Sequence, residues 1–220
     1  FVPMPPLHAS PTGPLRPGAL SLRVSRLGAE AGSLQEFRRG VLAMLRGCVA
    51  YDAAIFHALS PRVPLSTGVF VGLSPAALAS SMPRWDDLAV ELGALREAAN
   101  ERLAVSDEEV FPMGSRARAR FEGLVAKPFR MASLCMVHLV VRGAVRAAIV
   151  LLARRRQAFG AREVGLLRKV APAIATADVL HARLDDAPHP SMPVRLVCRD
   201  ERLTPRQRAI VEYVALGRTN

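Results

Sequence analysis

Hydrophobic residues recur at intervals of three and four in three stretches of the chain, which is the spacing of one face of a helix. These stretches are 33–48, 83–103 and 164–184. In the first, Ser33 and Glu36 have the spacing of a capping box, which satisfies free N–H groups of a first helical turn. The pattern predicts three amphipathic helices, and the third is long enough to pair with a second copy of itself.

Continuous apolar runs, bounded by turn residues, predict strands between these helices. Two runs, 51–59 and 66–73, are each followed by Ser-Pro, and two more, 129–141 and 144–153, are joined by Arg142-Gly143. The last two runs have the form of a β-hairpin. Along 129–141 both alternating sets of side chains are apolar, unlike a strand with one face in water. We therefore expect a sheet with a layer covering each face.

The regions outside this pattern divide the chain. Residues 1–20 contain six Pro and two Gly, which predicts a disordered or loosely docked arm over 1–32. Residues 185–202 have no clean period and predict a linker. Within 203–220, Thr204 fits an N-cap, Pro205 a first helical position and Gly217 a C-terminal stop, which predicts a short helix over about 205–216.

Charge adds a preference for partners. The 220 residues carry 30 basic and 19 acidic side chains, a net charge of +11, which favours polyanionic partners, nucleic acid first. The charge is segregated along the chain. Residues 51–115 have nine acids and four Arg, whereas 142–169 have eight basic residues and one acid, and 195–220 have six Arg and three acids.

Several protein classes are disfavoured. The longest stretch without charge, 63–83, contains three Pro, so it cannot be a membrane-spanning helix. Cys48, Cys135 and Cys198 are far apart, which indicates neither a disulfide framework nor a zinc site and favours a reducing, cytoplasmic setting. No phosphate-binding glycine loop and no nucleophile–base arrangement is present. We therefore expect no enzymatic activity, no metal site and no membrane partner.

The C-terminal segment carries the first resemblance to a known family. Leu203-Thr204-Pro205-Arg206-Gln207-Arg208 and Leu216-Gly217-Arg218-Thr219-Asn220 together resemble the opening of the LuxR-type helix-turn-helix, with Gln207 in place of the usual Glu. The printed sequence reaches only the first helix of that motif, before the helix that enters the major groove in this family. The resemblance implies DNA as a partner. The residues it nominates for DNA binding are Arg206, Arg208, Arg218 and Asn220.

The second resemblance covers 33–184 and is to the GAF sensor domain, in the PAS-like group of signalling folds. It rests on the hairpin turn at Val140-Val141-Arg142-Gly143, on 154–159 and on the helix containing Ala171-Pro172-Ala173-Ile174-Ala175. It implies an α+β fold: a GAF/PAS-like antiparallel sheet with a helical layer on one face and a ligand cavity or its filled remnant on the other. It also implies a homodimer formed through the helical layer.

Three residues of the predicted hairpin are candidates for ligand binding: Cys135, His138 and Arg146. The alternative for Cys135 and His138 is an ordinary place in the core, because lone Cys and His on apolar strands are usually buried there. Arg146 would need an anionic partner if buried, or it could extend outward beside the hairpin turn. His57 could join His138 across the sheet, although one sequence gives no strand register. The cofactor, if any, is not specified.

The function expected from these observations is a cytoplasmic LuxR-type transcriptional regulator. In it, a dimeric GAF-like domain over 33–184 senses a signal and, through the linker 185–202, controls the helix-turn-helix that begins in 203–220. The alternative is a truncated sensor or interaction protein that dimerises with other regulators, or inhibits them, without binding DNA itself. Arg154-Arg155-Arg156 could contact DNA or an acidic partner, or could be a solvated loop.

Overall fold

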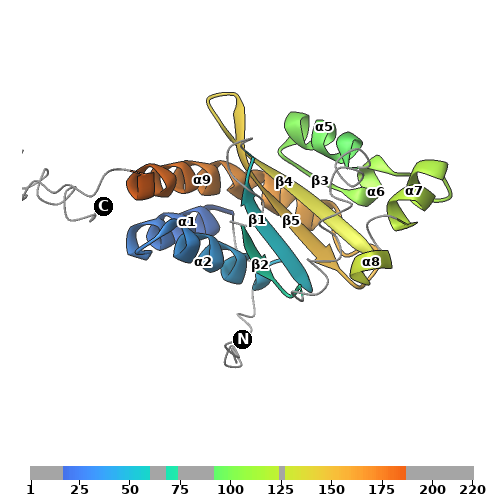
Figure 1. Cartoon of the computed structure of the whole chain (residues 1–220), viewed down its shortest axis with the longest axis horizontal. Helices are drawn as coiled ribbons and strands as arrows, with labels where there is room; N and C mark the ends of the chain where they lie inside the picture. Colours follow the sequence, from blue (N-terminus) through green and yellow to red (C-terminus); the bar gives the residue numbers. More distant parts are fainter. Residues whose placement is uncertain (1–16, 60–67, 74–91, 124–126, 187–220) are drawn as a thin grey trace, which may run out of the picture.

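The centre of the protein is one five-stranded antiparallel sheet with the strand order β2-β1-β5-β4-β3 (Figure 1). The computed structural model describes residues 17–59, 68–73, 92–123 and 127–186. The strands are β1 (Ala53–Ala58), β2 (Val69–Val71), β3 (Ala104–Ser106), β4 (Ser133–Val141) and β5 (Ala144–Ala153). Antiparallel pairing suits the apolar runs seen in the sequence, because each strand lies against a neighbour that continues the same apolar faces.

The hairpin of β4 and β5 forms as predicted, and Arg142 and Gly143 make its turn. Both have positive φ, 52° and 74°, as a two-residue type I′ turn requires. The register runs from Val141 opposite Ala144 to Ser133 opposite Ala153, with one irregularity between Leu139 and Val140. Seven of the nine β4 residues are buried, from Ser133 through Leu139, which confirms that both faces of this strand are covered.

Three helices cover one face of the sheet: α1 (Pro17–Glu30), α2 (Leu34–Arg46) and α9 (Ala161–Asp186). Ser33 is the N-cap of α2, and its hydroxyl accepts a hydrogen bond from the Glu36 N–H. The main core lies between these helices and the sheet. It includes Phe37 and Leu42 of α2, Leu167 and Ile174 of α9, Phe56 of β1, and Cys135 and Val137 of β4. The expected helical layer is confirmed.

The predicted arm over 1–32 is wrong for residues 17–30, which form α1. Leu20 and Val24 of this helix are fully buried in the main core. Pro17 is the first residue of α1, where its fixed φ suits a helix and its missing N–H leaves no intrahelical bond unmade. Pro17 therefore marks the start of a helix, and the four-residue spacing of Leu20 and Val24 was the sequence signal for it.

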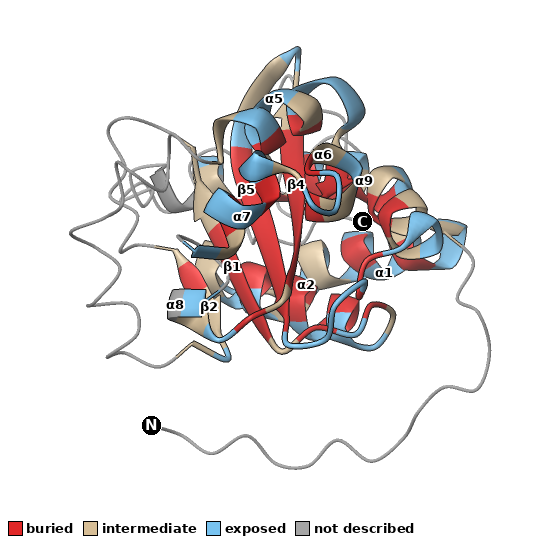
Figure 2. Cartoon of the chain, turned by 90° about the vertical axis from the view of Figure 1, so that its right-hand side faces the viewer, coloured by how far each residue is buried: buried red, intermediate tan, exposed pale blue. Residues whose placement is uncertain are grey.

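Short elements cover the opposite face of the sheet: α5 (Gly93–Arg102), α6 (Asp107–Val110), α7 (Arg116–Phe121) and α8 (Lys127–Phe129). A second apolar cluster joins this layer to the strands, with Leu95, Ala99, Phe111 and Phe121 packed near Ile55, Met136 and Val150. Figure 2 shows the buried strands between outer elements whose far sides are exposed. The sequence predicted a helix over 83–103, of which α5 is the described part. It did not predict β3, α6 or α7, because three to six residues are too few to show a period.

The remaining predictions lie outside the described residues. These are the linker after Asp186, the helix at 205–216, Trp85 and the first part of the helix predicted from Pro83. Within the part of the chain that the structure describes, no helix is long and apolar enough to cross a membrane.

Candidate functional site

Strand register brings His57 and His138 to the same face of the sheet. His57 of β1 and His138 of β4 both lie opposite Ala148 of β5, which is the strand between them. Side chains at the same level of neighbouring strands point to the same face. The two imidazoles therefore flank one small methyl side chain, on the side of the sheet that carries α5. We call these three residues the histidine row.

The end of α5 is fixed directly against the histidine row. The backbone N–H of His138 donates to the carbonyl of Leu103, the C-cap of α5, at 2.7 Å. This contact places Asn100, in the last turn of α5, beside the imidazole, and the His138 Nδ1 to Asn100 Oδ1 distance is 2.8 Å. Arg96 lies four residues before Asn100, so both occupy the same side of the helix.

The other ring nitrogen of His138 is buried and unpaired. The residue is only 2% exposed, and its Nε2 atom has no hydrogen-bond partner among the described residues, the one such buried side-chain atom that they contain. Buried polar atoms are nearly always paired in folded proteins, so an unpaired one calls for an explanation such as a bound molecule.

The environment of the histidine row disfavours positive charge on both rings. Burial lowers the pKa of His138 to about 4, with further contributions from the Arg96 guanidinium and from His57. Burial also lowers the pKa of His57, where the hydrogen bond with the Ala58 carbonyl opposes the effect and Arg38 and Arg96 add to it. At neutral pH both imidazoles are neutral, in a region of positive potential.

The shifted pKa of His138 makes stability depend on pH. Between pH 4 and 6.5 the unfolded chain binds this proton more readily than the native protein, so stability falls as the pH falls through that window. We expect unfolding to cost about 2 kcal/mol less at pH 5 than at pH 7.5 from this group alone. Urea unfolding at both pH values measures it. In His138→Asn, which does not titrate there, the difference between the two pH values should shrink by about that amount. An unchanged difference would contradict the assignment.

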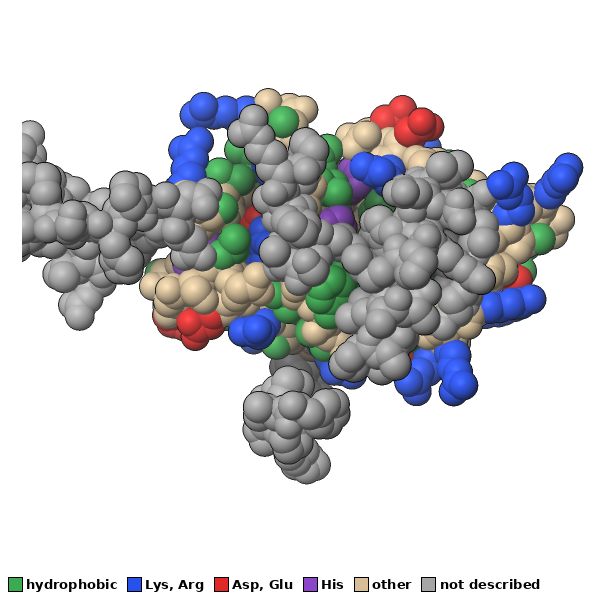
Figure 3. Space-filling view, viewed as in Figure 1, with side chains coloured by type: hydrophobic (Ala, Val, Ile, Leu, Met, Phe, Trp, Pro, Cys, Tyr) green, Lys and Arg blue, Asp and Glu red, His purple; other side chains and the backbone are tan. Residues whose placement is uncertain are grey.

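Buried apolar side chains continue the same face of the sheet around the histidine row. On the same face of the strands lie Ile55, Leu134, Met136, Val150 and Leu152, all in the second apolar cluster. In the space-filling view, histidine side chains are visible near the middle of the molecule, beside hydrophobic and basic side chains (Figure 3). Two neutral imidazoles, an amide and a guanidinium therefore lie at the border of a buried apolar cluster. A few polar groups beside apolar side chains are typical of the sites that bind small molecules.

The other two candidate residues lie elsewhere. Cys135 is fully buried in the main core beneath the helical layer, on the opposite face of β4 from His138. Burial raises the pKa of its thiol, so the thiol is protonated and unreactive at neutral pH. Arg146 is exposed, and its backbone carbonyl accepts from the Leu59 N–H. The burial that would have required an anionic partner for Arg146 is therefore absent, and its side chain extends into solvent.

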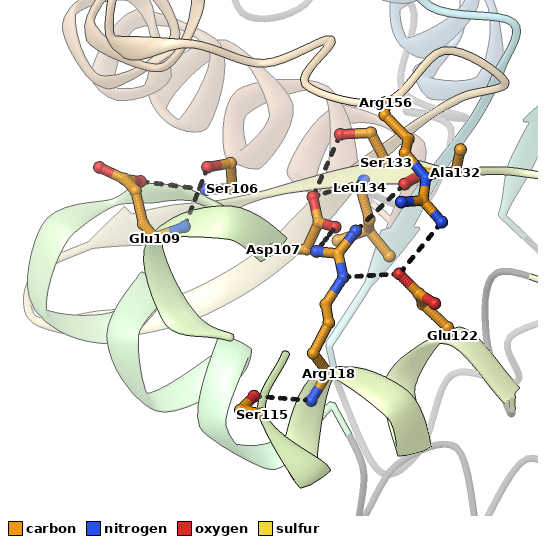
Figure 4. A network of polar contacts seen from close by, with 10 residues as sticks. All are labelled: Ser106, Asp107, Glu109, Ser115, Arg118, Glu122, Ala132, Ser133, Leu134 and Arg156. Carbon is orange, nitrogen blue, oxygen red and sulfur yellow. Dashed lines mark hydrogen bonds and ion pairs between the residues drawn. The ribbon is translucent and has the colours of Figure 1, made fainter. Parts of the chain in front are cut away.

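A polar network holds the short helices over the sheet (Figure 4). Asp107, at the start of α6, is fully buried and pairs with Arg118 of α7. Its other oxygen accepts from the Ser133 hydroxyl at 3.2 Å and from the Leu134 N–H at 2.9 Å, both at the start of β4. Arg118 also binds Glu122 at 3.0 Å and so lowers the pKa of that carboxyl. The network joins α6, α7 and β4 beside the second apolar cluster.

A second buried ion pair joins the helices on the other face. Arg38 of α2 binds both carboxylate oxygens of Asp178 of α9, at 2.7 and 3.0 Å. The guanidinium lies over the Phe56 ring, 4.9 Å from its centroid. Next to it, the Phe37 and His181 rings stack at 4.9 Å. Sequence reasoning missed this pair, as it missed Arg96, Asn100 and Asp107, because the partners are distant in sequence and carry no motif.

The other site predictions are not brought into this region. Arg206, Arg208, Arg218 and Asn220 lie outside the described residues. Arg154, Arg155 and Arg156 are exposed after β5, and Arg156 comes within 3.8 Å of Glu122, which fits a solvated loop. The described residues contain no group of three or more His, Cys, Asp or Glu placed to hold a metal ion.

Comparison with known proteins finds likeness in structure but not in sequence. No family model and no curated protein matches the sequence. The LBD domain of VqsR from Pseudomonas aeruginosa is 13% identical, with a TM-score of 0.52, over 73% of this chain and 95% of that one. The GAF3 domain of Slr1393 from Synechocystis is 18% identical, with a TM-score of 0.51, over 70% and 98%. The phycoerythrobilin-bound GAF domain of a cyanobacterial phytochrome is 13% identical, with a TM-score of 0.51, over 79% and 99%.

These neighbours establish the fold. The five-stranded antiparallel sheet with its flanking helices is a GAF-like α+β fold, as expected from the sequence. At such low identity the likeness describes the arrangement of the chain alone, since one fold hosts many functions.

Proposed function

We propose that this chain is the sensory part of a LuxR-type transcription regulator, which binds a small molecule on its GAF-like domain and controls a DNA-binding helix-turn-helix. The observation that carries the proposal is the combination of a GAF-like fold over the described residues with the LuxR-like segment 203–220 that follows it. The ligand-binding domain of VqsR, which has a similar fold, supports the assignment of sensing to this domain. The proposal needs no catalytic step.

Described contacts connect the candidate ligand face with the helix that leads toward the C-terminal segment. His57 and Phe56 are neighbours on β1 and point to opposite faces of the sheet. The Phe56 ring lies against the Arg38 guanidinium, which in turn binds Asp178 of α9. A ligand that displaces His57 therefore acts one residue away from the packing of α9. This supports α9 as the element that carries the signal onward.

We assign the dimer contact to the outer side of α1 and α9. These helices pack together, and each carries an exposed leucine, Leu22 at 65% and Leu180 at 55%. Large exposed apolar side chains on neighbouring helices are typical of an interface. A dimer would place two helix-turn-helix modules against the two half-sites of a DNA operator, as dimeric helix-turn-helix proteins do. In this proposal the protein acts in the cytoplasm, where its DNA is.

Binding to duplex DNA at different salt concentrations tests this function. The measurement uses the natural chain, including whatever follows Asn220. Three phosphate contacts per protomer, from Arg206, Arg208 and Arg218, make six in a dimer, so affinity should fall about a thousandfold between 50 and 200 mM salt. Arg208→Gln should reduce the slope of log affinity against log salt by about 2, one unit for each protomer.

The matched control is Arg155→Gln, which removes an exposed arginine from the loop after β5 and should leave the slope unchanged. Half the expected slope would indicate a monomer on DNA and contradict the dimer. A flat slope would overturn DNA binding and favour the alternative, an interaction protein that acts on other regulators without touching DNA.

A further inference from the structure

The hydrogen bond between His138 and Asn100 fixes which ring nitrogen carries the proton. The contact joins Nδ1 to the amide oxygen Oδ1 at 2.8 Å, and an amide oxygen can only accept. Nδ1–H is therefore the donor. In a neutral imidazole the other nitrogen then has no proton, so Nε2 presents a lone pair, which is the buried acceptor without a described partner.

A lone pair on imidazole can be satisfied by a metal ion or by a hydrogen-bond donor, and the surrounding charge selects between them. The Arg96 guanidinium acts electrostatically on both imidazoles of the row, and Arg38 acts on His57. Among the described residues, no carboxylate contributes to the pKa shift of either ring. Positive potential of this kind repels a cation, so the position favours a donor on a neutral or anionic molecule.

The remaining neighbours define the rest of such a molecule. Ala148 separates the two histidines across the sheet, and its methyl group is the smallest side chain that still covers the strand. Beyond it, Met136 and Val150 continue the same face within the second apolar cluster, where both are buried. A molecule that reaches His138 Nε2 therefore has the edge of this apolar cluster on one side and the polar groups of α5, Asn100 and Arg96, on the other.

We propose that the histidine row binds a small molecule with an apolar body and an O–H or N–H group that donates to His138 Nε2, with any negative charge directed toward Arg96. The inference rests on the proposed sensing function and specifies the chemistry of its ligand. Asn100 is a positioning residue in this site: it holds the ring in the tautomer that leaves Nε2 free to accept.

Nuclear magnetic resonance of the chain with ¹⁵N-labelled histidine tests the proposal, with 4-hydroxybenzoate as the probe. This molecule has an apolar ring, a phenolic donor and a carboxylate. Without the probe, we expect Nδ1 to be protonated and Nε2 to be unprotonated at pH 7. Adding the probe should shift the His138 Nε2 resonance in the direction of an accepted hydrogen bond and should change the Nδ1 resonance less.

The matched probe is 4-methoxybenzoate, which keeps the ring and carboxylate but has no donor. Its affinity should be at least about tenfold lower, the usual effect of leaving a buried acceptor unpaired. Phenol, which keeps the donor but has no charge, should also bind and should shift the same His138 Nε2 resonance. Arg96 is exposed, so its substitution carries little risk to folding. Arg96→Gln should lower the affinity for 4-hydroxybenzoate and leave the affinity for phenol nearly unchanged.

Three results would overturn the proposal: a proton on Nε2 in the free protein, no shift of the His138 resonances with 4-hydroxybenzoate, or equal affinity for the methoxy probe. His138→Phe, which retains an aromatic ring but has no acceptor, should abolish the preference for the hydroxyl. None of these readouts depends on DNA. If DNA affinity falls steeply with salt but the His138 resonances do not shift with the probe, the regulator proposal stands and the ligand proposal is overturned. If the His138 resonances shift as expected but DNA affinity does not depend on salt, the ligand proposal stands and DNA binding is overturned.

Discussion

Replacing Asp107 by alanine is expected to lower the free energy of unfolding by about 3–5 kcal/mol. The substitution leaves Arg118, whose side chain is 3% exposed, with its charge buried and only partly compensated by Glu122. It also leaves the Ser133 hydroxyl and the Leu134 N–H without their common acceptor. Losing one partner of a buried pair costs more than the pair contributes, because the other charge remains in a medium of low polarity.

Urea unfolding followed by circular dichroism measures this loss of stability. Asp107→Asn separates the cost of the lost charge from the cost of the lost hydrogen-bond acceptor. Asparagine keeps an oxygen that can accept from Ser133 and Leu134 but removes the negative charge, so its effect should be smaller than that of alanine. The matched control is Glu109→Gln on the same short helix, whose side chain is about one-third exposed and should cost less than about 1 kcal/mol. An alanine effect as small as the control would show that α6 and α7 are held by apolar packing alone.

Replacing Arg38 by methionine is expected to cost a similar amount, about 3–5 kcal/mol, because it leaves Asp178 buried and unpaired. The two side chains are 3% and 5% exposed and join α2 to α9. Methionine keeps most of the volume that lies over the Phe56 ring, so the loss reports mainly on the charge. Thermal and urea unfolding of the single variant measure it.

The double variant Arg38→Met with Asp178→Leu distinguishes a lost ion pair from lost packing. It leaves no charge behind, so it should be markedly more stable than Arg38→Met alone, as expected when two coupled groups are removed together. If the effects of the two substitutions on the free energy of unfolding instead add, the two charges are not coupled and the interface of α2 and α9 is held by its apolar residues. Arg39→Met, one residue along on the exposed side of α2, is the matched control and should be nearly neutral.

Much of the fold was predictable because its longer elements repeat a simple pattern. The 13 residues of α2 and the 26 of α9 give several turns of helical periodicity, and the apolar strands on either side of Arg142-Gly143 required a hairpin. The prediction was wrong for α1, where prolines earlier in the arm concealed a helix that begins at Pro17. It omitted β3 and α6, whose three and four residues form because neighbouring elements hold them.

The candidate site was predictable only in part. His138 and Cys135 were nominated from the sequence as possible ligand contacts on an apolar strand, and His57 was named as a possible partner of His138. Arg146 was nominated for its charge within an apolar strand. Cys135 lies under the helical layer and Arg146 is exposed. The residue types along one strand do not show which of its two faces packs against the helical layer and which faces α5. Asn100 and Arg96 carried no signal, because their importance comes from the position of α5 relative to β4.

Local sequence specifies the alternation of helices and strands, the hairpin turn, the two-sided burial of its strands and the resemblance of the C-terminal segment to a DNA-binding motif. These properties depend on neighbours within a few residues. The pairing of β1 and β4 with β5, and with it the alignment of His57 and His138 around Ala148, becomes visible in the folded chain alone. Shifting either strand by one residue would turn its histidine to the opposite face. That register is fixed by the packing of both apolar layers at once, which no local stretch of sequence contains.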